Sequence, residues 1–353
     1  MKLFTCPGCG HATFFEGVLC TRCGSQLGFA PDILQMLVVQ ADGTAEHDQT
    51  NWRRCGNYWE FNDCNWLVDA SDTTPLCISC RLNRTIPDLS VAGNQMLWHR
   101  LEQEKRRFVY SALRLKLPVA PKTESPGGLA FDFMADPDPS FHERNRVLTG
   151  HENGLITINI AEADPVTREQ MRAQMAEPYR TILGHFRHES GHYYWDRLVR
   201  DSSWLNEFRS LFGDERADYN ESLRQNYEVG PPPDWPEHFV SSYASSHPWE
   251  DWAETWSHYL HMVDTLETAW GYGVTLNPRH ADNATLFSSP EYDPYLMTDF
   301  DTLIEQWVPL TVALNSLNRS MGHDASYPFA LATPVIDKLA LVHRIVRQPQ
   351  GSA

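Results

Sequence analysis

The chain of 353 residues is short of positive charge, because 29 Lys and Arg face 46 Asp and Glu, for a net charge of −17. An acidic surface repels phosphate groups, so this balance argues against a nucleic-acid-binding surface over most of the chain. No apolar run reaches the roughly 18–20 residues that a bilayer span needs. The first 15 residues also have no apolar segment before the first cysteine pair. We therefore expect neither a membrane span nor a signal peptide.

Cysteine is absent after residue 80, and the first four of the eight cysteines form two Cys-x-x-Cys pairs. These pairs are separated by ten residues and consist of Cys6, Cys9, Cys20 and Cys23. Two thiolate pairs at this spacing are typical of a zinc ribbon, in which four sulfurs close a tetrahedral site. We expect a structural zinc within residues 1–30, and a cytoplasmic protein because reduced thiolates suit a reducing compartment.

The other four cysteines predict a second four-cysteine zinc site within residues 50–85. They are Cys55, Cys64, Cys77 and Cys80, of which only the last two form a Cys-x-x-Cys pair. The spacing leaves open an exchange of ligands between the two sites. A segment this short has too little apolar material for its own core, so metal would supply much of its folding free energy.

Five aromatic residues accompany the second cysteine group: Trp52, Tyr58, Trp59, Phe61 and Trp66. We expect them to pack around the metal. A stacking platform for single-stranded nucleic acid would need basic residues between the aromatics, and the segment has too few.

The rest of the chain reads as helices with a small sheet, so the predicted fold class is α+β. Residues 1–86 form the Cys-rich zinc-binding region and residues 87–353 a mainly helical domain. Apolar periodicity, prolines and alternation predict the elements. The helices are expected at 91–117, 165–175, 178–200, 248–266, 298–318 and 333–347, and the strands at 128–136 and 154–164.

The segment His188-Glu189-Ser190-Gly191-His192 carries the clearest chemistry. Two histidines four residues apart on a helix point to the same side, so their imidazoles can share one zinc ion. Glu189 then lies beside the open coordination position. This is the H-E-x-x-H pattern of zinc hydrolases, in which a metal-activated water attacks a carbonyl group. The alternative is a pair of helix histidines that are merely packed or solvated.

A zinc hydrolase of this type needs a third protein ligand, and the helix expected to begin near Pro248 offers two carboxylates. Glu250 and Glu254 lie one turn apart on one face. Either Glu250 is the ligand and Glu254 fixes the tautomer of a ligand histidine, or Glu254 is the ligand. His258 continues the same side and is expected close behind the ligands. A second metal held by Glu254 and His258 is a further alternative.

Tyr243 lies seven residues before Glu250, and the segment from Glu250 to Glu254 has the form E-x-x-A-E. This pattern resembles the lethal-factor-type gluzincins. The whole layout resembles the bacterial putative zinc-binding metallopeptidases with an N-terminal zinc ribbon. The resemblance implies a zincin-like metallopeptidase domain over residues 87–353, in which the first Glu is the ligand, the second supports the site and the Tyr approaches the zinc.

Together these features predict a zinc metallopeptidase with one catalytic and two structural zinc ions, acting on a peptide or protein substrate. Glu189 is the expected general base, and Tyr243 is expected to stabilise the oxyanion. The strand at 154–164 is either a sheet edge that binds extended substrate or an ordinary internal strand. The competing hypothesis is a zinc-stabilised interaction or regulatory protein, whose ribbon recruits a protein partner and whose gluzincin domain is catalytically silent.

Overall fold

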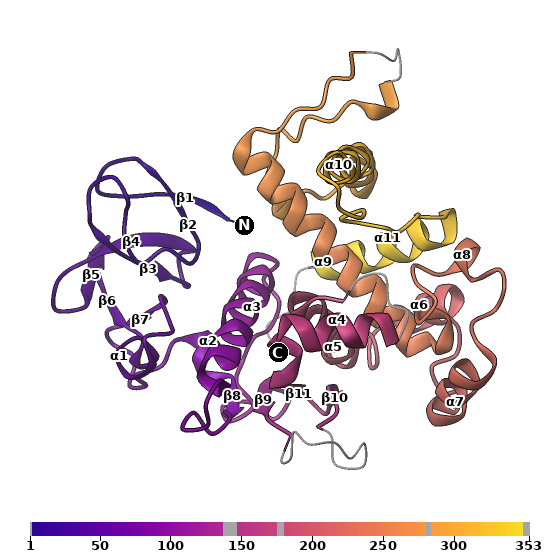
Figure 1. The fold of residues 1–353 in the computed structure, drawn as a ribbon, viewed down its shortest axis with the longest axis horizontal. Coiled ribbons are helices and arrows are strands. Elements are labelled where there is room, and N and C mark those ends of the chain that lie inside the picture. The colour runs from indigo at the N-terminus through magenta and orange to yellow at the C-terminus, as the bar shows by residue number, and fades with distance from the viewer. Residues whose placement is uncertain (1, 137–146, 175–179, 280–283, 349–353) are drawn as a thin grey trace. The chain divides into compact units, whose positions relative to one another are not determined.

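The computed structural model describes residues 2–136, 147–174, 180–279 and 284–348. The fold is α+β, as predicted, with small sheets in a zinc-ribbon-like N-terminal region and a mainly helical domain after it (Figure 1). Contacts divide the chain into two compact units, residues 1–168 and 169–353. The domain boundary expected after residue 86 stays a prediction. Among the described helices, none is long and apolar enough to cross a membrane.

The first unit begins with three small antiparallel sheets. Their strands are β1 (Leu3–Thr5) with β2 (Ala12–Phe14), β3 (Gln26–Ala30) with β4 (Gln35–Val39), and β5 (Thr44–His47), β6 (Thr50–Arg54) and β7 (Leu67–Asp69). Two short helices flank β7 in the sequence: α1 (Gly56–Phe61) precedes it and α2 (Ile78–Arg81) follows it. Seven of the eight cysteines lie in the connections between these short elements, where turns can bring them together, and Cys80 lies within α2.

The aromatic residues of this region do not all behave as predicted. Trp66 is fully buried and packs against Phe29, and Trp52 lies in the apolar cluster under β3 to β7. Trp59, by contrast, is 62% exposed, so its predicted place in the packing is wrong. It lies on a six-residue helix, which is too short to bury every side chain around its circumference.

A four-stranded sheet completes the first unit, with strand order β10-β11-β9-β8. Its strands are β8 (Asn83–Thr85), β9 (Ala130–Met134), β10 (Gly150–Glu152) and β11 (Leu155–Asn159), and α3 (Asn94–Arg114) connects β8 to β9. β11 pairs with β9 on one side and with β10 on the other. It is therefore an internal strand, and the hypothesis of a substrate-binding edge at 154–164 is wrong.

The second unit is helical, and most of its helices pack around α9 (Figure 1). A 3₁₀ turn, η2 (Ile160–Ala163), ends the first unit, and α4 (Pro165–Gln174) spans the boundary between the two units in the sequence. The elements of the unit are α5 (Ile182–Leu198), α6 (Leu205–Phe212), α7 (Tyr219–Val229), α8 (Trp235–His238), η3 (Ala244–Ser246), α9 (Pro248–Tyr272), η4 (Ala284–Leu286), η5 (Pro294–Leu296), α10 (Phe300–Ser320) and α11 (Thr333–Arg347).

Several helix boundaries differ from the sequence expectation by a few residues, and two ends are set by an identifiable capping residue. The N-terminal end of α5 is capped by Thr181, whose hydroxyl accepts a hydrogen bond of 2.9 Å from the backbone N–H of Gly184. The predicted start at Pro178, like the last residue of the helix expected at 165–175, lies outside the described residues. α9 continues six residues beyond the expected end at Leu266, because the residue that ends it is Gly273, with φ of 64°.

Close packing of α5 on α9 depends on Gly191. A Cβ atom at this position would lie 2.8 Å from Cα of Ala253, so only glycine permits the approach. Two indoles of α9 then reach α5: Trp252 donates to the carbonyl of Gly191 at 2.9 Å, and Trp256 donates to the hydroxyl of Ser190 at 3.2 Å. The helix that carries the H-E-x-x-H pattern is thus held directly against the helix that carries Glu250 and Glu254.

Candidate metal centre

His188 and His192 project from one side of α5, one turn apart, with ring centroids separated by 5.0 Å. His192 is almost fully buried and His188 is partly buried. Glu189 lies between them in sequence and is also buried. Because α5 packs on α9 directly at Gly191, both imidazoles face the first turns of α9. The helical spacing and the close packing together assemble the centre.

Glu250 completes a three-residue group with these histidines. It lies in the first turn of α9, after the cap residue His247 and Pro248. One potential ligand atom from each of the three residues lies within 4.8 Å of the others. Oε2 of Glu250 is 3.0 Å from Nε2 of His188, yet it is buried and accepts no hydrogen bond from the described residues. Two imidazole nitrogens and a carboxylate oxygen left without a donor fit a zinc ion.

Glu254 lies one turn later and contacts the other side of the His188 ring. Its Oε1 lies 2.7 Å from Nδ1 of His188, and its Oε2 accepts a hydrogen bond of 2.7 Å from the hydroxyl of Ser241. Both carboxylate oxygens are therefore engaged. The structure brings Glu250, rather than Glu254, together with both histidines as a potential ligand group.

The charges of the centre support Glu250 as the carboxylate of the potential ligand group. Burial opposes ionisation of Glu250, but His192 and His188 outweigh it and hold the pKa of that carboxyl well below its usual range. Burial raises the pKa of Glu189 above its usual value, although the two histidines oppose the shift. One carboxylate is thus held ionised beside the imidazoles, and the other is biased toward accepting a proton.

Tyr243 immediately precedes η3, and its ring centroid lies 6.0 Å from that of His188. Burial, followed by the negative charge of Glu250, raises the pKa of Tyr243 above its usual value. Its hydroxyl therefore stays protonated at neutral pH and can act as a hydrogen-bond donor.

Three residues of the centre were not found by sequence reasoning. The hydroxyl of Tyr219 donates to Oε1 of Glu250 at 2.6 Å, Ser241 donates to Glu254, and the ring of Trp249 lies 4.0 Å from that of His192. Trp249 directly precedes Glu250 in the sequence, and this adjacency could have indicated that its ring lies near the centre. Tyr219 is 31 residues away from its partner, and no motif links the two.

His258 lies one turn beyond Glu254, as its spacing predicts, but its described contact is with a different segment. Its Nδ1 is 2.6 Å from the hydroxyl of Tyr327, and burial lowers its pKa to about 4. Within the described residues, no potential metal-binding group combines Glu254 with His258. The alternative of a second metal at these two residues therefore finds no geometric support there.

The eight cysteines form two separate clusters, Cys6, Cys9, Cys20 and Cys23 in one and Cys55, Cys64, Cys77 and Cys80 in the other. None of the eight forms a disulfide. Sulfur atoms of Cys6 and Cys23 lie 3.8 Å apart, and those of Cys64 and Cys77 lie 3.7 Å apart. A tetrahedral site with zinc–sulfur bonds of about 2.3 Å has an edge of roughly 3.8 Å. Both clusters fit structural zinc, and they exchange no ligands.

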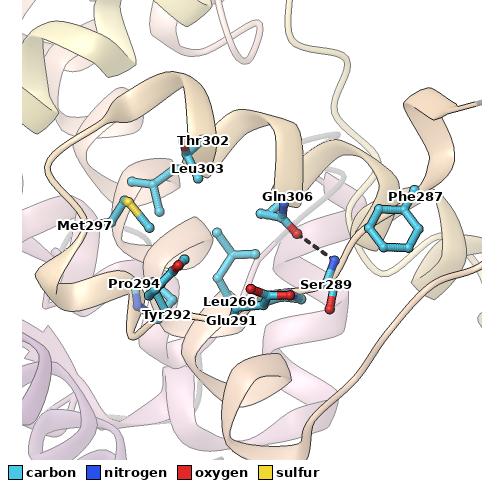
Figure 2. Close-up of a pocket in the computed structure, with 11 residues that line it drawn as sticks. Leu266, Phe287, Ser289, Glu291, Tyr292, Pro294, Met297, Thr302, Leu303 and Gln306 are labelled. Atoms are coloured by element: carbon cyan, nitrogen blue, oxygen red, sulfur yellow. Dashed lines mark hydrogen bonds between the residues drawn. The ribbon is translucent and has the colours of Figure 1, made fainter.

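The second unit also contains a pocket whose lining includes none of the candidate zinc ligands (Figure 2). It has a volume of about 260 Å³ and lies between α9, α10 and the segment that joins them. Leu266, Met297 and Leu303 supply apolar surface. Gln306 fixes the wall, because its Oε1 accepts a hydrogen bond of 2.8 Å from the backbone of Ser289. The pocket is a structural feature apart from the metal centre.

Comparison with known proteins gives a consistent result. Residues 94–345 match the model of the family described as "Putative zinc-binding metallo-peptidase", and residues 3–91 match a zinc-ribbon domain. Uncharacterized proteins of Mycobacterium bovis and Mycobacterium tuberculosis are 43% identical over 348 residues, which cover 98% of this chain and 95% of theirs. No solved structure shows a significant match. The chain therefore belongs to the family of putative zinc-binding metallo-peptidases and carries an N-terminal zinc-ribbon domain.

Proposed function

We propose that the protein is a zinc metallopeptidase that hydrolyses peptide bonds in a peptide or protein substrate. The observation that carries the proposal is the convergence of His188, His192 and Glu250 within 4.8 Å, beside the buried carboxyl of Glu189. A zinc ion held by these three ligands would supply the Lewis acidity that activates a water molecule and polarises a carbonyl group. The two cysteine clusters would hold structural zinc in the ribbon region.

Glu189 serves as the general base. Its carboxylate takes the proton that the attacking water loses and then passes that proton to the leaving amine. Burial in the wall of the centre raises its pKa, which favours proton uptake at that point of the reaction. The position of Glu189 on α5 is supported by the close contact of Gly191, two residues further along the helix, with Ala253.

Tyr243 donates a hydrogen bond to the oxyanion that develops on the scissile carbonyl. Its raised pKa keeps the donor protonated over the neutral range. Removal of one such donor typically lowers kcat by about 10²–10³-fold. Glu254 is a positioning residue, because it holds the ring of His188 through Nδ1 and so presents Nε2 toward Glu250.

The test compares the zinc-loaded protein with its Glu189→Gln variant on denatured casein and on a diverse peptide library read by mass spectrometry. We expect the variant to keep its zinc content and to lose about 10²–10⁴-fold in cleavage rate. Equal cleavage by both proteins would contradict the role of Glu189. Absence of cleavage by the zinc-loaded wild type in both assays would overturn the peptidase proposal in favour of a zinc-stabilised interaction or regulatory protein.

A further inference from the structure

Helix α7 lies at the surface of its unit. None of its residues is buried, and two of its apolar side chains, Tyr227 and Val229, are 70% and 81% exposed. Its charged side chains pair along the helix itself, where Arg224 binds Glu221 and Glu228. Such surface pairs contribute little to attachment. One face of α7 is half-buried, at Tyr219, Ser222, Leu223 and Asn226, and the N-terminal end of this face, at Tyr219, reaches the metal centre.

That end is held by the first turn of α9. The ring of Tyr219 packs edge-to-face against His247 and Trp249, with ring centroids 5.2 Å and 5.9 Å away. Nε2 of His247 also lies 3.1 Å from the carbonyl oxygen of Ala217, just before α7. His247 caps α9 and Trp249 directly precedes Glu250, so the anchor of α7 is built on the same turn as the candidate third ligand.

The hydroxyl of Tyr219 controls the orientation of that ligand. It donates to Oε1 of Glu250 at 2.6 Å, whereas Oε2 accepts no hydrogen bond from the described residues and lies 3.0 Å from Nε2 of His188. The terminal torsion of a glutamate is broad, so an unheld carboxylate would rotate. The hydroxyl engages one oxygen and leaves the other directed at the histidine.

We propose that Tyr219 is a positioning residue that fixes the rotation of Glu250 and thereby couples helix α7 to occupancy of the metal centre. The inference rests on the metal centre of the proposed function. Coupling is reciprocal: if the Tyr219 hydroxyl strengthens metal binding, the bound metal strengthens attachment of α7 by the same factor. The helix therefore reports whether the site is loaded.

The first experiment measures the affinity of the third zinc by competition with a chelator of known affinity. Tyr219→Phe removes only the hydroxyl and keeps the ring between His247 and Trp249, so the fold is preserved. We expect its third zinc to bind about 10–100-fold more weakly, the range found when hydrogen-bond partners of ligands are removed. The control is Tyr272→Phe, at an exposed tyrosine at the end of α9, which should bind like the wild type.

The second experiment follows amide hydrogen exchange over residues 219–229. Exchange should accelerate when the third zinc is stripped from the wild type, and also in zinc-loaded Tyr219→Phe, but not in Tyr272→Phe. Unchanged exchange in both cases would overturn the coupling. So would a third zinc that binds Tyr219→Phe within twofold of the wild-type affinity, and the metal centre would then stand. A wild type that binds only two zinc ions would instead contradict the metal centre itself.

Discussion

Nδ1 of His188 lies 2.7 Å from Oε1 of Glu254, and this contact distinguishes the role of Glu254 from that of Glu250. An ionised carboxylate accepts hydrogen bonds, so Glu254 favours the proton on Nδ1, and Nε2 would then present its lone pair to a metal ion. Nε2 is the atom that lies 3.0 Å from Glu250. Two glutamates one helical turn apart thus contact opposite nitrogens of a single ring. This arrangement suits Glu254 to orienting the imidazole and places Glu250 in the candidate ligand group.

Gly191→Ala should destabilise the second unit. The new Cβ would lie 2.8 Å from Cα of Ala253, a backbone atom that moves only with the whole helix. Overpacking of this kind costs about 1–3 kcal/mol. Helix propensity alone would give the opposite sign, since Ala is better than Gly in a helix by about 1 kcal/mol. Denaturant unfolding distinguishes the two, and a variant more stable than the wild type would show that α5 and α9 are not in close contact.

Cys20→Ser and Cys77→Ser should each lower the structural zinc content by one ion, and the double variant by two. The reason is that the residues belong to separate clusters, Cys20 to one and Cys77 to the other, which share no sulfur ligand. Elemental analysis of the purified proteins provides the count. If either single variant lost two ions, the clusters would depend on each other in a way that their geometry does not explain.

His258 should make the folded state sensitive to mild acid. Burial lowers its pKa from 6.5 to about 4, while Glu254, one turn earlier, acts in the opposite direction. Neighbouring His261 is also buried with a lowered pKa, and the partner of Nδ1 is the Tyr327 hydroxyl. As pH falls below 6.5, His258 binds a proton in the unfolded chain but stays neutral in the folded state. Stability is therefore complete above pH 6.5 and is lost toward pH 4, by roughly 3 kcal/mol for this residue.

The measurement is the pH dependence of the unfolding free energy in His258→Asn, whose amide oxygen can still accept a hydrogen bond from Tyr327. The candidate ligand histidines, His188 and His192, are common to both proteins, so their contribution cancels in the difference. We expect a shallower loss of stability between pH 6.5 and 4 in the variant. Parallel curves for the variant and the wild type would mean that His258 does not titrate in this way.

The sequence predicts those parts of the structure that depend on local spacing. Helix periodicity and a capped first turn are local properties, so α3, α5, α10 and α11 were anticipated within a few residues. The same holds for cysteine pairs that close a turn. The position of β11 inside its sheet depends on pairing with β10 and β9, which periodicity along one strand does not report. For the same reason an internal strand was not distinguished from an edge.

In the metal centre, too, the residues predicted from sequence are those related by local spacing, and the others depend on tertiary packing. His188 and His192 are brought together by one helix, whereas Tyr219 reaches Glu250 only through the packing of α7 beside η3 and α9. The choice between Glu250 and Glu254 also depends on tertiary structure, because both lie on one face of α9. Packing of α5 at Gly191 and the hydrogen bond from Ser241 to Glu254 favour Glu250 as the candidate ligand.

The most direct test of the account is a zinc count on purified wild type, Glu250→Ala and Glu254→Ala by elemental analysis. We expect three zinc ions in the wild type, two in Glu250→Ala, and three in Glu254→Ala under zinc-replete conditions, with the third bound about 10–100-fold more weakly in Glu254→Ala. Three ions in Glu250→Ala together with two in Glu254→Ala would contradict the assignment of the third ligand. Two ions in the wild type, with both cysteine clusters filled, would contradict the metal centre as a whole.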